Sequence, residues 1–145
     1  MISYQAERKI HVVVSMVATL CIALFFTSSI IVELFGTHEQ IAQLKSLIVI
    51  PGLFVLVPAM ATTGGTGFAL SKHRTGKRVE KKKRRMKVIA MNGLLILVPA
   101  AIFLDQWASA GLFNAKFYIV QGCELLAGAI NLTLMGMNIR DGRKL

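Results

Sequence analysis

Four long runs of apolar residues, almost free of charge, constrain this chain more than any other feature. They cover about residues 11–35, 46–71, 87–104 and 116–138. A helix that crosses about 30 Å of hydrocarbon needs about 20 residues, with a range of about 17–25. Lipid offers no hydrogen-bond partner to the backbone, and the runs lack the alternating pattern of a membrane-spanning strand. The sequence therefore predicts an all-α, polytopic membrane protein with four transmembrane helices.

The composition excludes the common soluble classes of protein. Apolar residues make up 54% of the 145-residue chain and charged residues 17%, against about 45–50% and about 25% in an average soluble domain. A soluble chain of this length forms one domain, and four fully apolar helices would leave that domain no polar surface. We therefore expect a single transmembrane domain over 1–145, and not a soluble enzyme, a nucleic-acid-binding domain or a secreted disulfide scaffold.

The distribution of lysine and arginine predicts the orientation. Ten of the 17 basic residues lie in 72–87, and five more lie near the two termini, whereas the other two connections carry only Lys45 and Lys116. Basic connections stay in the cytoplasm. We therefore expect an antiparallel up-down four-helix bundle with both termini and a basic loop, 72–87, in the cytoplasm. One or both of the flanking helices should continue into that loop, which should not form a separate domain. A bacterial inner membrane is the first expectation for localisation, and a mitochondrial inner membrane the second.

The net charge of +10 raises the question of whether the protein binds nucleic acid. Here the charge lies beside the ends of membrane helices, where each basic residue attracts anionic head groups by about 1 kcal/mol. We therefore expect no nucleic-acid partner. The residues expected to dock anionic lipid or a protein partner are Lys81, Lys82, Lys83, Arg84 and Arg85.

Polar and small residues recur along the fourth run with alternating steps of three and four. They are Gln121, Glu124, Gly128, Asn131, Met135 and Asn138. This spacing places them on one helix face, which should turn toward the protein because small residues allow close approach and polar ones find partners there. Glu124 is the one carboxylate well inside a run. Ionisable groups inside the membrane are costly and are candidates for functional sites.

One functional hypothesis is a small membrane cytochrome with one b-type haem. Such a site needs axial ligands, usually histidine. His11 and His73 are expected at the same side of the membrane, at the ends of consecutive antiparallel helices. Glycines could make room for the flat macrocycle, so the candidate cofactor-binding residues are His11, His73, Gly64, Gly67 and Asn92. This hypothesis would give the protein a role in electron transfer.

A second hypothesis is proton- or cation-coupled transport through Glu33 and Glu124, in a site completed by Gln121 and Asn131. Carboxylates in a dry membrane interior can act as ion or proton relays. Four short helices make a thin transporter, so this hypothesis requires oligomerisation.

The third hypothesis, which the sequence favours, is a non-catalytic accessory, scaffolding or assembly subunit. The sequence contains no acyl-transfer triad, phosphate-binding loop or HExxH motif, although this leaves enzymatic activity open. In this hypothesis the polar face packs inside the bundle and the basic loop docks a partner or anionic lipid. A second copy of the chain or another membrane protein would be the partner.

Overall fold

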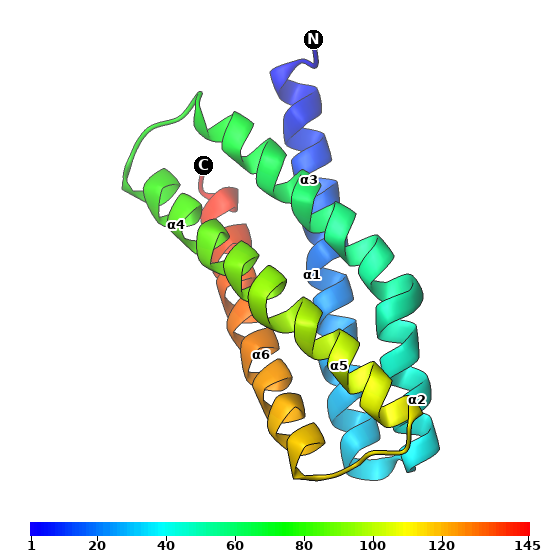
Figure 1. Ribbon diagram of the computed structural model, residues 1–145. Coiled ribbons are helices and arrows are strands. Elements are labelled where there is room, and N and C mark those ends of the chain that lie inside the picture. The colour runs from blue at the N-terminus through cyan, green and yellow to red at the C-terminus, as the bar shows by residue number, and fades with distance from the viewer.

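The computed structural model describes all residues, 1–145, and all of its regular secondary structure is helical. The helical elements are α1 (Tyr4–Phe35), α2 (His38–Leu47), η1 (Ile48–Leu53), α3 (Phe54–Ser71), α4 (Lys77–Asn92), η2 (Gly93–Leu97), α5 (Val98–Ser109) and α6 (Ala115–Arg143). Since α2, η1 and α3 follow one path, as do α4, η2 and α5, the chain forms four long helices packed as a bundle (Figure 1). The predicted all-α bundle of four long helices is confirmed.

Each of the four helices is long and apolar enough to cross a membrane. Only 22 of the 145 residues are buried inside the protein, and large apolar side chains such as Leu24, Phe54, Leu95 and Leu126 are exposed on its sides. A soluble monomer rarely exposes so much contiguous apolar surface. The burial pattern therefore agrees with a multi-pass membrane protein whose sides face lipid.

Local sequence signals explain where three of the helices begin. The side chain of Ser3 accepts a hydrogen bond from the Ala6 amide, and that of Asn114 accepts one from the Phe117 amide. At the start of α2, Thr37 and Gln40 form a reciprocal capping box. These side chains satisfy amides that a helix start otherwise leaves unpaired.

Two interruptions break the long helices near prolines. In η1 the backbone of Ile50 is extended, with φ −133° and ψ 112°, directly before Pro51. Proline disfavours the helical conformation of the residue before it, and it cannot donate a hydrogen bond to the helix ladder. The second interruption, η2, consists of wide π-type turns and precedes Pro99.

The helices extend beyond the predicted apolar runs. α1 begins at Tyr4 rather than near residue 11, and α6 continues to Arg143. The segment 72–87, which we expected as a basic loop flanked by continuing helices, is helical from Lys77, so only residues 72–76 form the connection. Apolar content ends where the membrane should end, whereas helical hydrogen bonding continues through charged residues.

Both chain termini and the connection between α3 and α4 lie at one end of the bundle (Figure 1). We call this the terminal end, and the end with the α1–α2 and α5–α6 connections the opposite end. Two apolar cores lie along the bundle. The first comprises Ala18, Ile22, Leu56, Ala59, Ile89 and Met135, and the second comprises Ile41, Leu104, Ala108 and Phe117.

Candidate functional site

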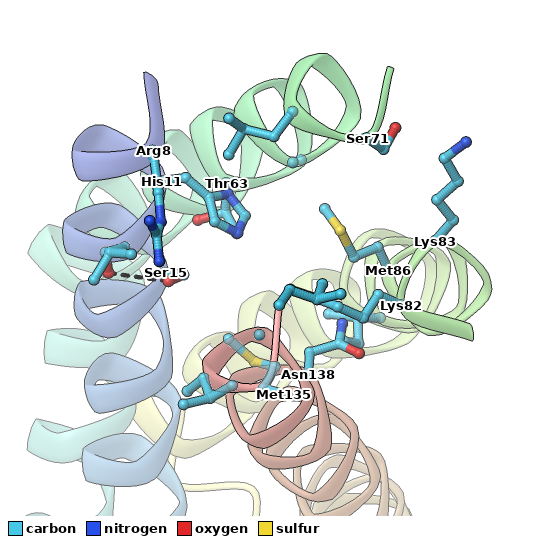
Figure 2. Close-up of a pocket in the computed structure, with 18 of the residues that line it drawn as sticks. Arg8, His11, Ser15, Thr63, Ser71, Lys82, Lys83, Met86, Met135 and Asn138 are labelled. Atoms are coloured by element: carbon cyan, nitrogen blue, oxygen red, sulfur yellow. Dashed lines mark hydrogen bonds between the residues drawn. The ribbon is translucent and has the colours of Figure 1, made fainter. Parts of the chain in front are cut away.

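A half-open cavity of about 350 Å³ lies between the helices at the terminal end. Its walls come from α1 and α3 on one side and from α4 and α6 on the other, as Figure 2 shows for His11 and Thr63 facing Met86 and Asn138 across open space. Small-molecule sites typically measure about 300–1,000 Å³, so the cavity has the size of a modest ligand site.

The two parts of the cavity wall differ in chemistry. The charged part consists of five cations, Arg8, Arg74, Lys82, Lys83 and Arg143. The apolar part includes four of the seven methionines, Met16, Met60, Met86 and Met135. No Asp or Glu side chain lines the cavity. The cavity is therefore amphipathic and electropositive.

His11 lies in the cavity wall and is held by α3. Its Nδ1 lies 3.0 Å from the Thr66 hydroxyl. Gly67 lets α3 lie close to Met86 of α4 and His11 of α1. A Cβ at this position would lie 2.7 Å from Met86 Cε and 3.1 Å from His11 Cε1. A Cβ at Gly64 would meet nothing within 4 Å. Gly67 is thus a packing position, whereas Gly64 borders empty space.

The residues expected to bind haem are only partly brought together. His11, Gly64 and Gly67 share the cavity wall. His73 is not among the residues that line the cavity, and its ring packs edge-on against Tyr4 at a centroid distance of 5.5 Å. Asn92 also lies outside the cavity wall. The structure therefore does not place the two histidines on one common cavity.

Asn92 instead joins α4 to α6 deep in the bundle. Its Nδ2 donates to Asn131 Oδ1 at 2.8 Å and to the Ala127 carbonyl at 2.9 Å. Asn131 is fully buried and donates to the Ile89 carbonyl at 3.3 Å. Hydrogen bonds of this kind hold helices together in lipid, so both asparagines have a packing role.

The five basic residues expected to dock a partner have different surroundings. Arg85 Nη1 forms an ion pair with Asp141 Oδ2 at 2.6 Å and also donates to Asn138 Oδ1 at 3.4 Å. Lys82 and Lys83 line the cavity, and Lys83 Nζ lies 3.7 Å from Glu80 Oε1.

The remaining two, Lys81 and Arg84, are exposed on the surface of α4. None of the four ion pairs of the chain includes Lys82, although its side chain is half-buried. Lys82 thus has no ion-pair partner in direct contact, and Asp141 acts on it only at longer range.

A buried ion pair lies toward the opposite end. Lys45 Nζ contacts Glu124 Oε1 at 3.1 Å, and the two side chains are only 1% and 12% exposed. Ser29 Oγ accepts a second hydrogen bond from Lys45 Nζ at 3.4 Å, and Gln121 Nε2 donates to Glu124 Oε1 at 3.4 Å. Glu124 therefore has both a cation and a hydrogen-bonding neighbour as partners.

Glu33 completes this group, which we call the buried charge cluster: Ser29, Glu33, Lys45, Gln121 and Glu124. Glu33 interacts electrostatically with both Lys45 and Glu124. One oxygen of each acidic side chain and the Gln121 amide oxygen are buried without a hydrogen-bond partner. The cluster therefore contains two carboxylates, one ammonium group and three free acceptor atoms, an arrangement able to hold a proton or a small cation.

Sequence reasoning missed two features of these sites. Asp141 follows Asn138 by three residues, so it continues the polar face of α6, and this spacing could have identified it as a partner for a basic residue of α4. The four methionines of the cavity come from four different helices, so no spacing within one helix brings them together.

Comparisons with known proteins place the chain in a family. Neither a curated protein nor a solved structure matches it. A family model described as Domain of unknown function (DUF8056) matches residues 5–111, which extend from the start of α1 to the turn after α5 and cover well over half of the chain. The chain therefore belongs to the DUF8056 family.

Proposed function

We propose that this protein is an integral membrane accessory or scaffolding subunit whose terminal end binds the anionic surface of the cytoplasmic leaflet. In this proposal the four helices cross the membrane in an up-down antiparallel order. Both termini and the α3–α4 connection lie in the cytoplasm of a bacterium. A second copy of the chain or another membrane protein packs against the lipid-facing sides.

A single observation carries this proposal, namely the concentration of basic residues at the terminal end. The terminal end holds 15 of the 17 basic residues. Of the two others, Lys45 is buried in its ion pair and Lys116 lies 5.3 Å from the centroid of the Trp107 ring. A polybasic segment beside membrane helices gains about 1 kcal/mol per residue from anionic lipid, so only the terminal end is suited to an anionic surface.

Vesicles of defined composition test this proposal. The purified protein is reconstituted in phosphatidylcholine alone and in phosphatidylcholine with phosphatidylglycerol, and its melting midpoint is compared. We expect a higher midpoint with the anionic lipid, and a smaller rise for the triple variant Lys81→Gln, Arg84→Gln, Lys87→Gln. These three residues are exposed on α4. Equal midpoints in both lipids would contradict the proposal.

A second candidate function, proton- or cation-coupled transport, is supported by the buried charge cluster. Its two carboxylates outnumber its one ammonium group, and Glu33 keeps a buried oxygen free. A proteoliposome assay with a pH-sensitive dye tests this candidate. Ion-dependent proton movement that Glu124→Gln abolishes at an unchanged protein level would favour transport. A proton permeability equal to that of protein-free vesicles would exclude it.

A further inference from the structure

The position of the cavity relative to the membrane limits what it can hold. Its five cations belong to the basic ends of the helices and to the α3–α4 connection, whereas Met16, Met60, Ile89 and Met135 belong to the apolar runs. In the orientation proposed above, the cavity therefore crosses the boundary between head groups and hydrocarbon. A ligand that fills it must have a polar part and an apolar part.

The charged part of the cavity selects the sign of the ligand. Five cations and no Asp or Glu side chain line it. Lys82 is half-buried without an ion-pair partner, whereas Arg85, one turn away on the same helix, is neutralised by Asp141. Partly desolvating an ammonium group without a direct ion-pair partner is unfavourable, and Asp141 acts on Lys82 only at longer range, so an anion bound beside Lys82 would reduce this cost.

The apolar part is suited to a flexible chain. Methionine is unbranched and has three rotatable bonds, so methionine-lined surfaces adapt to ligands of variable shape. The wall also has a vacant position at Gly64, where a side chain would meet nothing within 4 Å. Open space beside a helix inside an amphipathic cavity provides room for an acyl chain.

We propose that this cavity binds one molecule of an acidic phospholipid, with its phosphate among Arg8, Lys82 and Arg143 and part of an acyl chain along Gly64 and the methionines. The inference rests on the proposed function for its orientation, but it is more specific. The proposed function needs only diffuse attraction between surface charges and the leaflet, whereas the cavity requires one bound molecule and a fixed set of residues.

Native mass spectrometry of the full chain in detergent tests the inference. The probes are phosphatidylglycerol, phosphatidylcholine and inorganic phosphate, each added separately. We expect one molecule of phosphatidylglycerol to remain bound, and phosphatidylcholine and inorganic phosphate to be lost. Retention of phosphatidylcholine to the same extent would contradict selection by charge. Retention of inorganic phosphate alone at the same level would contradict the role of the acyl chain.

Two matched pairs of variants locate the site. Gly64→Leu fills the vacant space, whereas Gly65→Leu adds the same side chain at an exposed position with nothing within 4 Å. Lys82→Gln removes a cation of the cavity, whereas Lys81→Gln removes an exposed one on the same helix. We expect Gly64→Leu and Lys82→Gln each to weaken retention about tenfold, equivalent to about 1.4 kcal/mol, and both controls to bind like the wild type.

The outcomes separate this inference from the proposed function. If Lys81→Gln weakens retention as much as Lys82→Gln and Gly64→Leu has no effect, binding is diffuse, and the cavity site is wrong while the proposed function stands. If the anionic lipid leaves the melting midpoint in vesicles unchanged, the proposed function is wrong whatever the cavity binds. Because Gly64→Leu places its side chain in open space, its melting midpoint should match that of Gly65→Leu, so a loss of binding would not reflect unfolding.

Discussion

Toward the opposite end of the bundle Lys45 lies buried against Glu124, whereas at the terminal end Lys82 borders an open cavity with no Asp or Glu side chain in its wall. In the first region positive charge is part of the packing, since Ser29 and Gln121 complete the hydrogen bonds of the pair. In the second region it faces empty space. Burial and pairing, more than residue type, therefore decide whether a charge stabilises the fold or remains free for a ligand.

The largest expected effect comes from breaking the buried ion pair. Lys45→Met leaves Glu124 without its cation beside a second carboxylate, Glu33. Removing one partner of a buried pair typically costs about 3–5 kcal/mol. We expect a loss of this size in the free energy of unfolding, measured by denaturant titration in detergent micelles. Lys116→Met, at the surface, is the control and should change little.

The double variant Lys45→Met, Glu124→Leu sharpens this prediction. It removes both charges, so much of the lost stability should return, because an apolar pair can replace a buried ion pair with little cost. A double variant as unstable as Lys45→Met alone would mean that the ion pair is not what stabilises this region.

A smaller effect is expected at Gly128, where α6 packs against Phe26 of α1. A Cβ at Gly128 would lie 3.3 Å from Phe26 Cδ2, so Gly128→Leu must displace a packed aromatic ring. Overpacking of this kind costs about 1–3 kcal/mol. Ile130→Leu, on the exposed side of the same helix, should be nearly silent. Equal melting midpoints for the two variants would show that the assigned packing face of α6 is wrong.

The asparagine pair should give an effect of similar or smaller size. Asn131→Leu leaves Asn92 with one of its two hydrogen bonds and removes the donor to the Ile89 carbonyl. An unsatisfied buried polar group costs about 1–3 kcal/mol, and in membranes measured interhelical hydrogen bonds average about 0.6 kcal/mol. We therefore expect a loss near 1 kcal/mol by denaturant titration, and stability equal to that of the wild type would mean that the pair contributes nothing.

The smallest effect is expected for Arg85, which pairs with Asp141 near the end of α6. Arg85→Gln should lower the melting midpoint slightly, whereas Arg84→Gln, at an exposed neighbouring position, should leave it unchanged. If both variants have the same melting midpoint as the wild type, the ion pair does not hold α4 to α6.

How much the sequence could predict follows from the range of the interactions involved. The four helices depend on runs of 18 or more apolar residues, and the inward face of α6 depends on spacing within one helix. Gln121, Gly128 and Asn131 are buried as that spacing predicts. The cavity depends on how pairs of helices lie relative to each other, which no local pattern encodes. The same limit explains why Asn92, expected near a cofactor, instead bonds to Asn131 on another helix.

The buried charge cluster and the electropositive cavity should lie toward opposite sides of one membrane. Single cysteines at Thr37, in the α1–α2 connection, and at Thr75, in the α3–α4 connection, test it most directly in a variant with Cys21 and Cys123 replaced by alanine. With a membrane-impermeant maleimide on intact cells, we expect labelling at residue 37 only, and in inverted membrane vesicles at residue 75 only. Labelling of both positions from the same side would refute this topology.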